Sequence, residues 1–130
     1  MKRTSLLLAV AVLLVSLGSP IQAGDETTMT GEYIWNRQDV PTTIKAVFTP
    51  SGDARWDVSF YFKFREESHV YSGTAEGSLS EGALKGEVRN ENKKRTFIFS
   101  GEFADGVFNG THAEMRDGKK RDTGTITFGS

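Results

Sequence analysis

The chain has 130 residues, with 16 Lys and Arg against 17 Asp and Glu, 14 glycines and no cysteine. This composition excludes a collagen-like chain, a disulfide-stapled mini-protein and a nucleic-acid-binding protein that relies on bulk positive charge. The lack of cysteine also excludes a thiol enzyme and a thiolate metal site.

The first 23 residues have the pattern of a secretory signal peptide. Lys2 and Arg3 precede an apolar run over residues 6–17, and the segment ends with Ile21-Gln22-Ala23, a small-residue cleavage site. The apolar run is shorter than the roughly 20 residues that a membrane span needs. We therefore predict cleavage after Ala23 and export to the periplasm or the medium, as is typical of a bacterial protein. An uncleaved anchor is the alternative, and a lipoprotein anchor is excluded because it needs a cysteine.

Cleavage would leave 107 residues with 14 basic and 17 acidic side chains, a net charge of −3. This length is typical of one domain and suffices to bury a core without disulfides. Residues 24–30 are polar and aperiodic, so we expect a disordered N-terminal lead. A single antiparallel β domain is expected over residues 31–130, with no membrane span.

Apolar residues recur with a period of two along the rest of the chain. In the clearest case, large apolar residues at alternate positions of 56–64 are separated by polar ones, which is typical of a half-buried antiparallel strand. Asp-Gly pairs between the apolar segments suit two-residue type I′ hairpins. The same alternation predicts seven further strands, at 31–36, 43–49, 69–79, 83–90, 95–103, 107–114 and 123–129.

Eight short strands with short connections predict an all-β fold. We expect an eight-stranded antiparallel up-and-down β-barrel, similar in architecture to lipocalins and avidins. A two-sheet β-sandwich is the alternative. The barrel is favoured because closure leaves no exposed strand edge in an exported monomer.

Two glycine-flanked hairpins repeat with a spacing of 24 residues, at 77–86 and 101–110. Glycine opposite glycine permits sharp coiling and leaves room inside the sheet. Either phenylalanine rings from other strands fill this room, or it is a cavity for a small apolar ligand. If Glu81-Gly82 and Asp105-Gly106 are the turns, the facing pairs are Leu79–Leu84, Phe103–Phe108, Gly77–Gly86 and Gly101–Gly110.

The sequence FSGEFADG, with a further glycine four residues later, resembles a MORN repeat. A second copy precedes it, so the resemblance spans roughly residues 75–112. It departs from the family pattern at Leu84 and Phe108, where MORN units carry polar residues, and at Val88 and His112, near the family's second glycine. The resemblance implies hairpin units of this period, and we do not carry over the membrane or scaffold roles of MORN proteins.

Alternate turns of an up-and-down barrel collect at opposite ends, and one end receives most of the basic loops. We expect these loops to form a basic rim that steers an anionic partner. The alternative is that they only solubilise loops and protect edges. The predicted rim residues are Lys93, Lys94, Arg95, Lys119, Lys120 and Arg121, with Arg37, Arg65 and Arg116 at the same end.

Strand parity directs both histidines toward the interior near this basic end. His69 and Tyr71 share the inner face of one strand, and His112 and Glu114 share that of another. A histidine and a carboxylate on one face would suit metal binding or acid–base chemistry. Because the two strands are not neighbours in an eight-stranded barrel, we instead interpret the four residues as a ligand-binding mouth. We predict no metal, no cofactor and no catalytic group.

The sequence thus predicts an exported, non-enzymatic protein that binds a small or anionic ligand at a basic barrel mouth, with no nucleic-acid partner. No hydrolase elbow, phosphate-binding glycine loop or zinc-protease motif occurs. An enzyme based on His112 and Glu114 is a further hypothesis. The main alternative is an interaction or inhibitor module that docks an exported protein through its exterior. The outward apolar positions there are Ile34, Val47, Tyr61, Val70 and Ile98.

Overall fold

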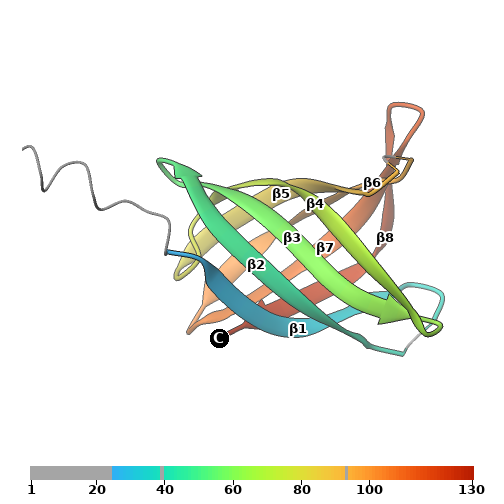
Figure 1. Ribbon diagram of the computed structural model, residues 1–130, viewed down its shortest axis with the longest axis horizontal. Coiled ribbons are helices and arrows are strands. Elements are labelled where there is room, and N and C mark those ends of the chain that lie inside the picture. The colour runs from blue at the N-terminus through green and yellow to red at the C-terminus, as the bar shows by residue number, and fades with distance from the viewer. Residues whose placement is uncertain (1–24, 39, 93) are drawn as a thin grey trace, which may run out of the picture.

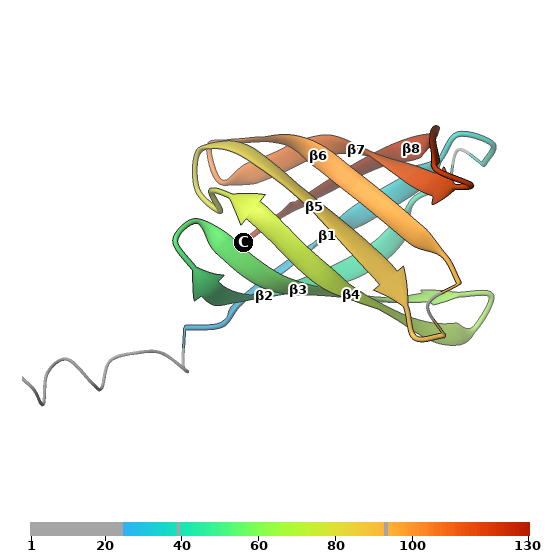
Figure 2. The ribbon, with the colours of Figure 1, turned by 90° about the horizontal axis from the view of Figure 1, so that it is seen from above.

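A computed structural model describes residues 25–38, 40–92 and 94–130 as a closed barrel of eight antiparallel strands in chain order (Figures 1 and 2). The predicted up-and-down barrel is therefore confirmed over the sandwich. The predicted signal peptide and Lys93 lie outside the described residues. No helix long and apolar enough to cross a membrane occurs in the part of the chain described. The strands are β1 (Thr27–Trp35), β2 (Thr42–Gly52), β3 (Arg55–Phe64), β4 (Glu67–Gly77), β5 (Gly82–Asn90), β6 (Thr96–Ala104), β7 (Val107–Arg116) and β8 (Lys119–Gly129).

The first strand begins earlier than the sequence indicated. Residues 27–30, which were expected to be disordered, pair with residues 45–48 of β2. Met29 is buried against the core, so this polar-looking segment contributes one inward apolar side chain. The expectation of a disordered lead is therefore wrong for residues 27–30.

Phenylalanine rings fill one half of the barrel, at the end that carries the β2–β3, β4–β5 and β6–β7 turns. The Phe108 and Phe128 rings stack with centroids 4.6 Å apart, and Phe48 and Phe103 flank Phe128 at 5.7 and 6.0 Å. All four rings are almost completely buried. Burying each such side chain contributes about 1.5–3 kcal/mol, so this half supplies much of the core.

The two glycine-flanked hairpins differ. In the second hairpin Gly101 pairs with Gly110 and the adjacent phenylalanines face each other, as predicted. In the first hairpin Gly77 pairs with Leu84 and not with Gly86, so that register is wrong. The reason is a wider loop, because the Ser78 hydroxyl oxygen accepts hydrogen bonds from the backbone N–H groups of residues 80 and 81 at 3.0 and 3.1 Å.

Two-residue turns with positive φ join β6 to β7 and β7 to β8. Asp105 and Gly106 have φ of 53° and 80°, and Asp117 and Gly118 have φ of 52° and 75°, as a type I′ hairpin requires. The second turn extends the β7–β8 hairpin beyond its predicted ends (Figure 1). Residues 119–121, predicted to be a loop, are therefore part of β8.

We predict that Gly101→Ala destabilises the barrel by about 1–3 kcal/mol, the usual cost of overpacking. A Cβ at this inward position would lie 2.5 Å from the Gly110 Cα and would also meet the Asn109 carbonyl oxygen. Gly52→Ala is the matched control, because its Cβ would meet Arg55 at an ordinary 3.6 Å. Urea unfolding followed by tryptophan fluorescence measures both. Equal stability of the two variants would contradict the close approach of β6 and β7.

Candidate functional site

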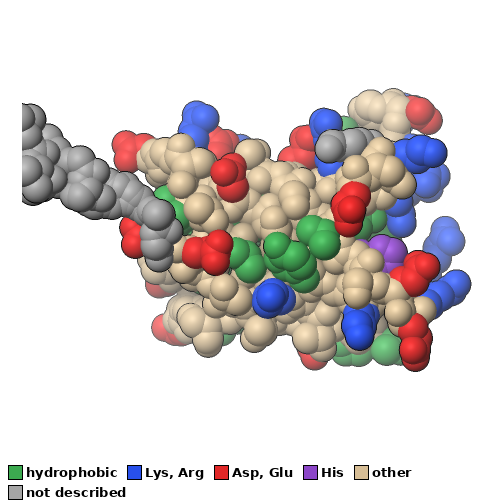
Figure 3. All heavy atoms as spheres, in the orientation of Figure 1, with side chains coloured by type: hydrophobic (Ala, Val, Ile, Leu, Met, Phe, Trp, Pro, Cys, Tyr) green, Lys and Arg blue, Asp and Glu red, His purple; other side chains and the backbone are tan. Residues whose placement is uncertain are grey.

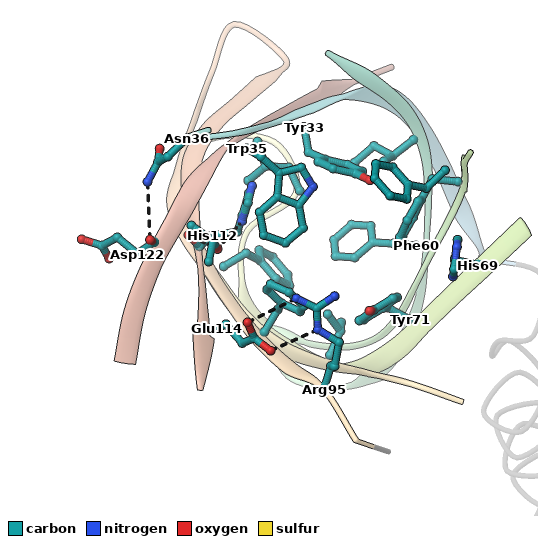
Figure 4. Close-up of a pocket in the computed structure, with 18 of the residues that line it drawn as sticks. Tyr33, Trp35, Asn36, Phe60, His69, Tyr71, Arg95, His112, Glu114 and Asp122 are labelled. Carbon is teal, nitrogen blue, oxygen red and sulfur yellow. Dashed lines mark hydrogen bonds and ion pairs between the residues drawn. The ribbon is translucent and has the colours of Figure 1, made fainter. Parts of the chain in front are cut away.

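The other half of the barrel holds a cavity of about 520 Å³. It opens at the end where the β1–β2, β3–β4, β5–β6 and β7–β8 connections lie (Figure 4). This volume falls within the roughly 300–1,000 Å³ of small-molecule sites. Phenylalanine rings thus fill one half of the interior, and the other half is open.

Aromatic side chains from several strands form the cavity wall. The Tyr33 and Phe62 rings meet edge to face at 5.1 Å, and the Trp35 and Phe97 rings do so at 5.6 Å. Figure 4 shows the Tyr33, Trp35, Phe60 and Tyr71 rings around the opening. Edge-to-face contacts hold rings in fixed orientations, so this wall is a preformed apolar surface.

Arg95, directly before β6, and Glu114 on the neighbouring β7 form an ion pair on one side of the mouth (Figure 4). The Arg95 Nε and Nη2 donate to the two carboxylate oxygens of Glu114 at 3.1 and 3.2 Å. The guanidinium also lies over the Trp35 and Phe97 rings, 5.7 and 5.1 Å from their centroids. A two-pronged contact plus two cation–π contacts fix its position at the opening.

The Arg95 hydrogen bonds hold the pKa of the Glu114 carboxyl below its ordinary value, although burial opposes this shift. Arg116 adds a second positive charge, with its Nη2 3.8 Å from Glu114 Oε1. Beside the pair, burial raises the pKa of the Tyr71 hydroxyl, and the Arg95 charge limits that rise. Glu114 is thus ionised at neutral pH even though its side chain is only 9% exposed.

His112 joins three strands and has both ring nitrogens engaged. Nε2 lies 3.2 Å from the Ile34 carbonyl oxygen, which only accepts, so we assign the proton to Nε2. In the neutral ring Nδ1 is then an acceptor 2.7 Å from the Thr123 hydroxyl, whose single proton is shared between Nδ1 and the His112 carbonyl oxygen at 3.0 Å. Burial lowers the pKa of His112, which favours this neutral form. His112 therefore links β7 and β8 to β1 at the barrel seam.

A β-bulge sets the position of Thr123. Opposite β7, His112 pairs with Gly124 but Ala113 pairs with Asp122, so Thr123 is the additional residue on β8. The additional residue shifts the inward-outward alternation of β8 by one position. Between the bulge and the mouth, Glu114 therefore pairs with Arg121. The sequence analysis missed this bulge, and the glycine at position 124 was the available signal.

The four residues predicted to form the mouth, His69, Tyr71, His112 and Glu114, all line the cavity. In the described part of the chain, however, no hydrogen bond joins His112 to Glu114, and no cluster of three or more His, Asp or Glu residues is arranged to hold a metal ion. His69 stacks on Phe62 at 5.3 Å near the rim. Both histidines contribute their rings to the cavity lining.

Only part of the predicted rim reaches the cavity. Arg95 and Arg121 line it, whereas Lys94, Lys119 and Lys120 are exposed outside the lining. Trp35 and Phe97 line the cavity and were not predicted as site residues, although their inward parity was readable. The Arg95–Glu114 pair was also missed. The signal was the predicted Asp105-Gly106 turn, whose register makes the two residues diagonal neighbours across β6 and β7.

The lining is positively charged, although the chain as a whole has a net charge of −1. The lining includes four arginines, at 37, 95, 116 and 121, and two acidic residues, Glu114 and Asp122, which gives it a net charge of +2. Figure 3 shows Lys and Arg side chains gathered at this end, with acidic side chains among them. An anion entering the mouth therefore meets a favourable potential.

The outward apolar positions lie on several strands. Tyr61 and Val70 face each other across β3 and β4, and Val47 lies on the adjoining β2. Ile34 is on β1 and Ile98 on β6. Four of the five positions are thus on the adjacent strands β1 to β4, and Ile98 lies apart from them on β6.

Comparisons of this chain with known proteins identify no relative. The chain matches no protein-family model, and no curated protein or solved structure is significantly similar to it. The MORN resemblance therefore stays a prediction.

We predict that the protein loses stability as the pH falls below about 6.5, the ordinary histidine value. Because the native pKa of His112 is lowered, the unfolded chain binds the proton more tightly and acid favours unfolding. The stability gap between wild type and His112→Gln should be constant above this pH and shrink below it, by at most about 1.4 kcal/mol per pH unit. Urea unfolding from pH 5 to 8 measures the gap, and a gap that does not change with pH would contradict the assignment.

Proposed function

We propose that this chain is an exported, non-enzymatic binding protein that takes one small amphipathic anion into the open half of its barrel. The observation that carries the proposal is an aromatic-walled cavity of about 520 Å³ whose lining includes four arginines, all on the side of the opening formed by β6, β7, β8 and β1. Concave, mostly apolar sites with a few oriented polar groups are the usual form of small-molecule sites. The export part of the proposal rests on the signal-like first 23 residues.

The two regions of the site match two parts of a ligand. The inner wall of Tyr33, Phe62 and Phe97 presents ring faces and edges, which suit an apolar or aromatic body. The arginines at the opening suit an acidic group that remains near water. Because the buried phenylalanines close the far end, the ligand would enter and leave through the mouth.

The neutral dye N-phenyl-1-naphthylamine, which fluoresces in apolar surroundings, tests the cavity. We expect saturable binding of one dye per chain. Val88→Phe places a ring in the lining, where Val88 is 4% exposed, and should weaken binding about tenfold, equivalent to about 1.4 kcal/mol. Fluorescence titration of both proteins gives the two affinities.

Val47→Phe adds the same ring on the outer face of β2 and should leave dye affinity unchanged. Trp56→Phe leaves Trp35, which lines the cavity, as the sole tryptophan, so dye binding should quench its emission. Dye uptake that does not saturate, or that Val88→Phe leaves intact, would contradict a binding cavity.

A further inference from the structure

Glu114 is an unusual residue for the inside of a barrel. Within the described residues, it and His112 are the buried polar or charged side chains. Its partner Arg95 is 43% exposed, so Glu114 carries most of the desolvation cost of the ion pair, and apolar residues in place of such pairs are often as stable. Stability of the fold therefore does not by itself require a carboxylate at this position.

In this ion pair, Arg95 already binds a carboxylate group, that of Glu114, in the way that it would bind the carboxylate of a ligand. The planar fork of Arg95 binds both oxygens of Glu114 through Nε and Nη2, an arrangement that matches the planar geometry of a carboxylate. The Trp35 and Phe97 rings support the guanidinium independently of Glu114. Arg95 would therefore keep its position if another carboxylate replaced that of Glu114.

Glu114 has a second partner available. Arg116 Nη2 lies 3.8 Å from Glu114 Oε1, longer than the contacts with Arg95, and Arg121 is its register partner on β8. A Glu114 carboxylate displaced from Arg95 could pair with these arginines without becoming an isolated buried charge. A ligand carboxylate would lower the net charge of the lining from +2 to +1, so no excess of negative charge builds up.

We infer that the ligand is a monocarboxylate with an apolar, ring-sized body, and that its carboxylate replaces that of Glu114 on Arg95. Glu114 then occupies the acid-binding position in the empty protein and moves to Arg116 when the ligand binds. This inference rests on the proposed function and adds the acidic group and the residue that selects it. Glu114 competes with the ligand, so removing its charge should strengthen binding.

Calorimetric titration with 2-naphthoate and its neutral isostere 2-naphthamide tests the exchange. We expect Glu114→Gln to bind naphthoate about tenfold or more tightly than wild type, since the ligand carboxylate no longer meets a like charge at the site. Naphthamide affinity should stay within about twofold. Glu87→Gln is the matched control, because Glu87 also pairs with an arginine, at 3.2 Å, but on the outer face; it should change neither affinity.

The variant Arg95→Gln gives a second test, which does not require that Glu114→Gln folds. It should reduce naphthoate affinity to that of naphthamide. Equal strengthening of naphthoate and naphthamide by Glu114→Gln, or unchanged naphthoate affinity in Arg95→Gln, would overturn the inference. Naphthamide that fails to bind at all would instead count against the cavity function.

Discussion

Closure of eight strands requires every second side chain to share one narrow interior. An eight-stranded barrel is only just wide enough for side chains to fill, so the inward residues at each level decide whether that level is packed or open. At one end Phe48, Phe103, Phe108 and Phe128 meet and fill the space. Toward the mouth the inward rings rest against one another along the wall, and the charged side chains are held at the opening. The cavity follows from this uneven filling.

The basic character of the mouth depends on the β8 bulge as much as on composition. Without the additional residue Thr123, the alternation that buries Ile126 would continue inward through Gly124 to Asp122. The bulge places Arg121 opposite Glu114 instead, and it brings the Thr123 hydroxyl to His112. Gly124 allows this arrangement, because a Cβ there would lie 2.8 Å from His112 Nε2. One irregularity thus closes the seam and sets the charge of the opening.

Much of the fold could be predicted because a period of two is a local property of the sequence. The strand number, the barrel, the inward parity of His112 and Glu114 and the location of the basic end all follow from it. Loop width did not follow, since the Ser78 hydroxyl widens one hairpin turn and shifts its register. Parity alone gives the direction of the Glu114 side chain and not its contacts. Its pairing with Arg95 could have been predicted only by combining parity with the register that the Asp105-Gly106 turn sets between β6 and β7.

Histidine and glutamate two residues apart suggested acid–base chemistry, and the structure gives them separate tasks. His112 uses both ring nitrogens to hold β7 and β8 to β1, so neither nitrogen is free to exchange a proton with a ligand. Glu114 uses both oxygens on Arg95. The seam contact fixes the wall beside the mouth, while the ion pair can be exchanged because Arg116 stands near as an alternative partner. His112 and Glu114, at successive inward positions of β7, thus have different tasks: His112 holds the wall in place and Glu114 forms the contact that a ligand can replace. A fixed wall with one replaceable ionic contact is suited to selective binding.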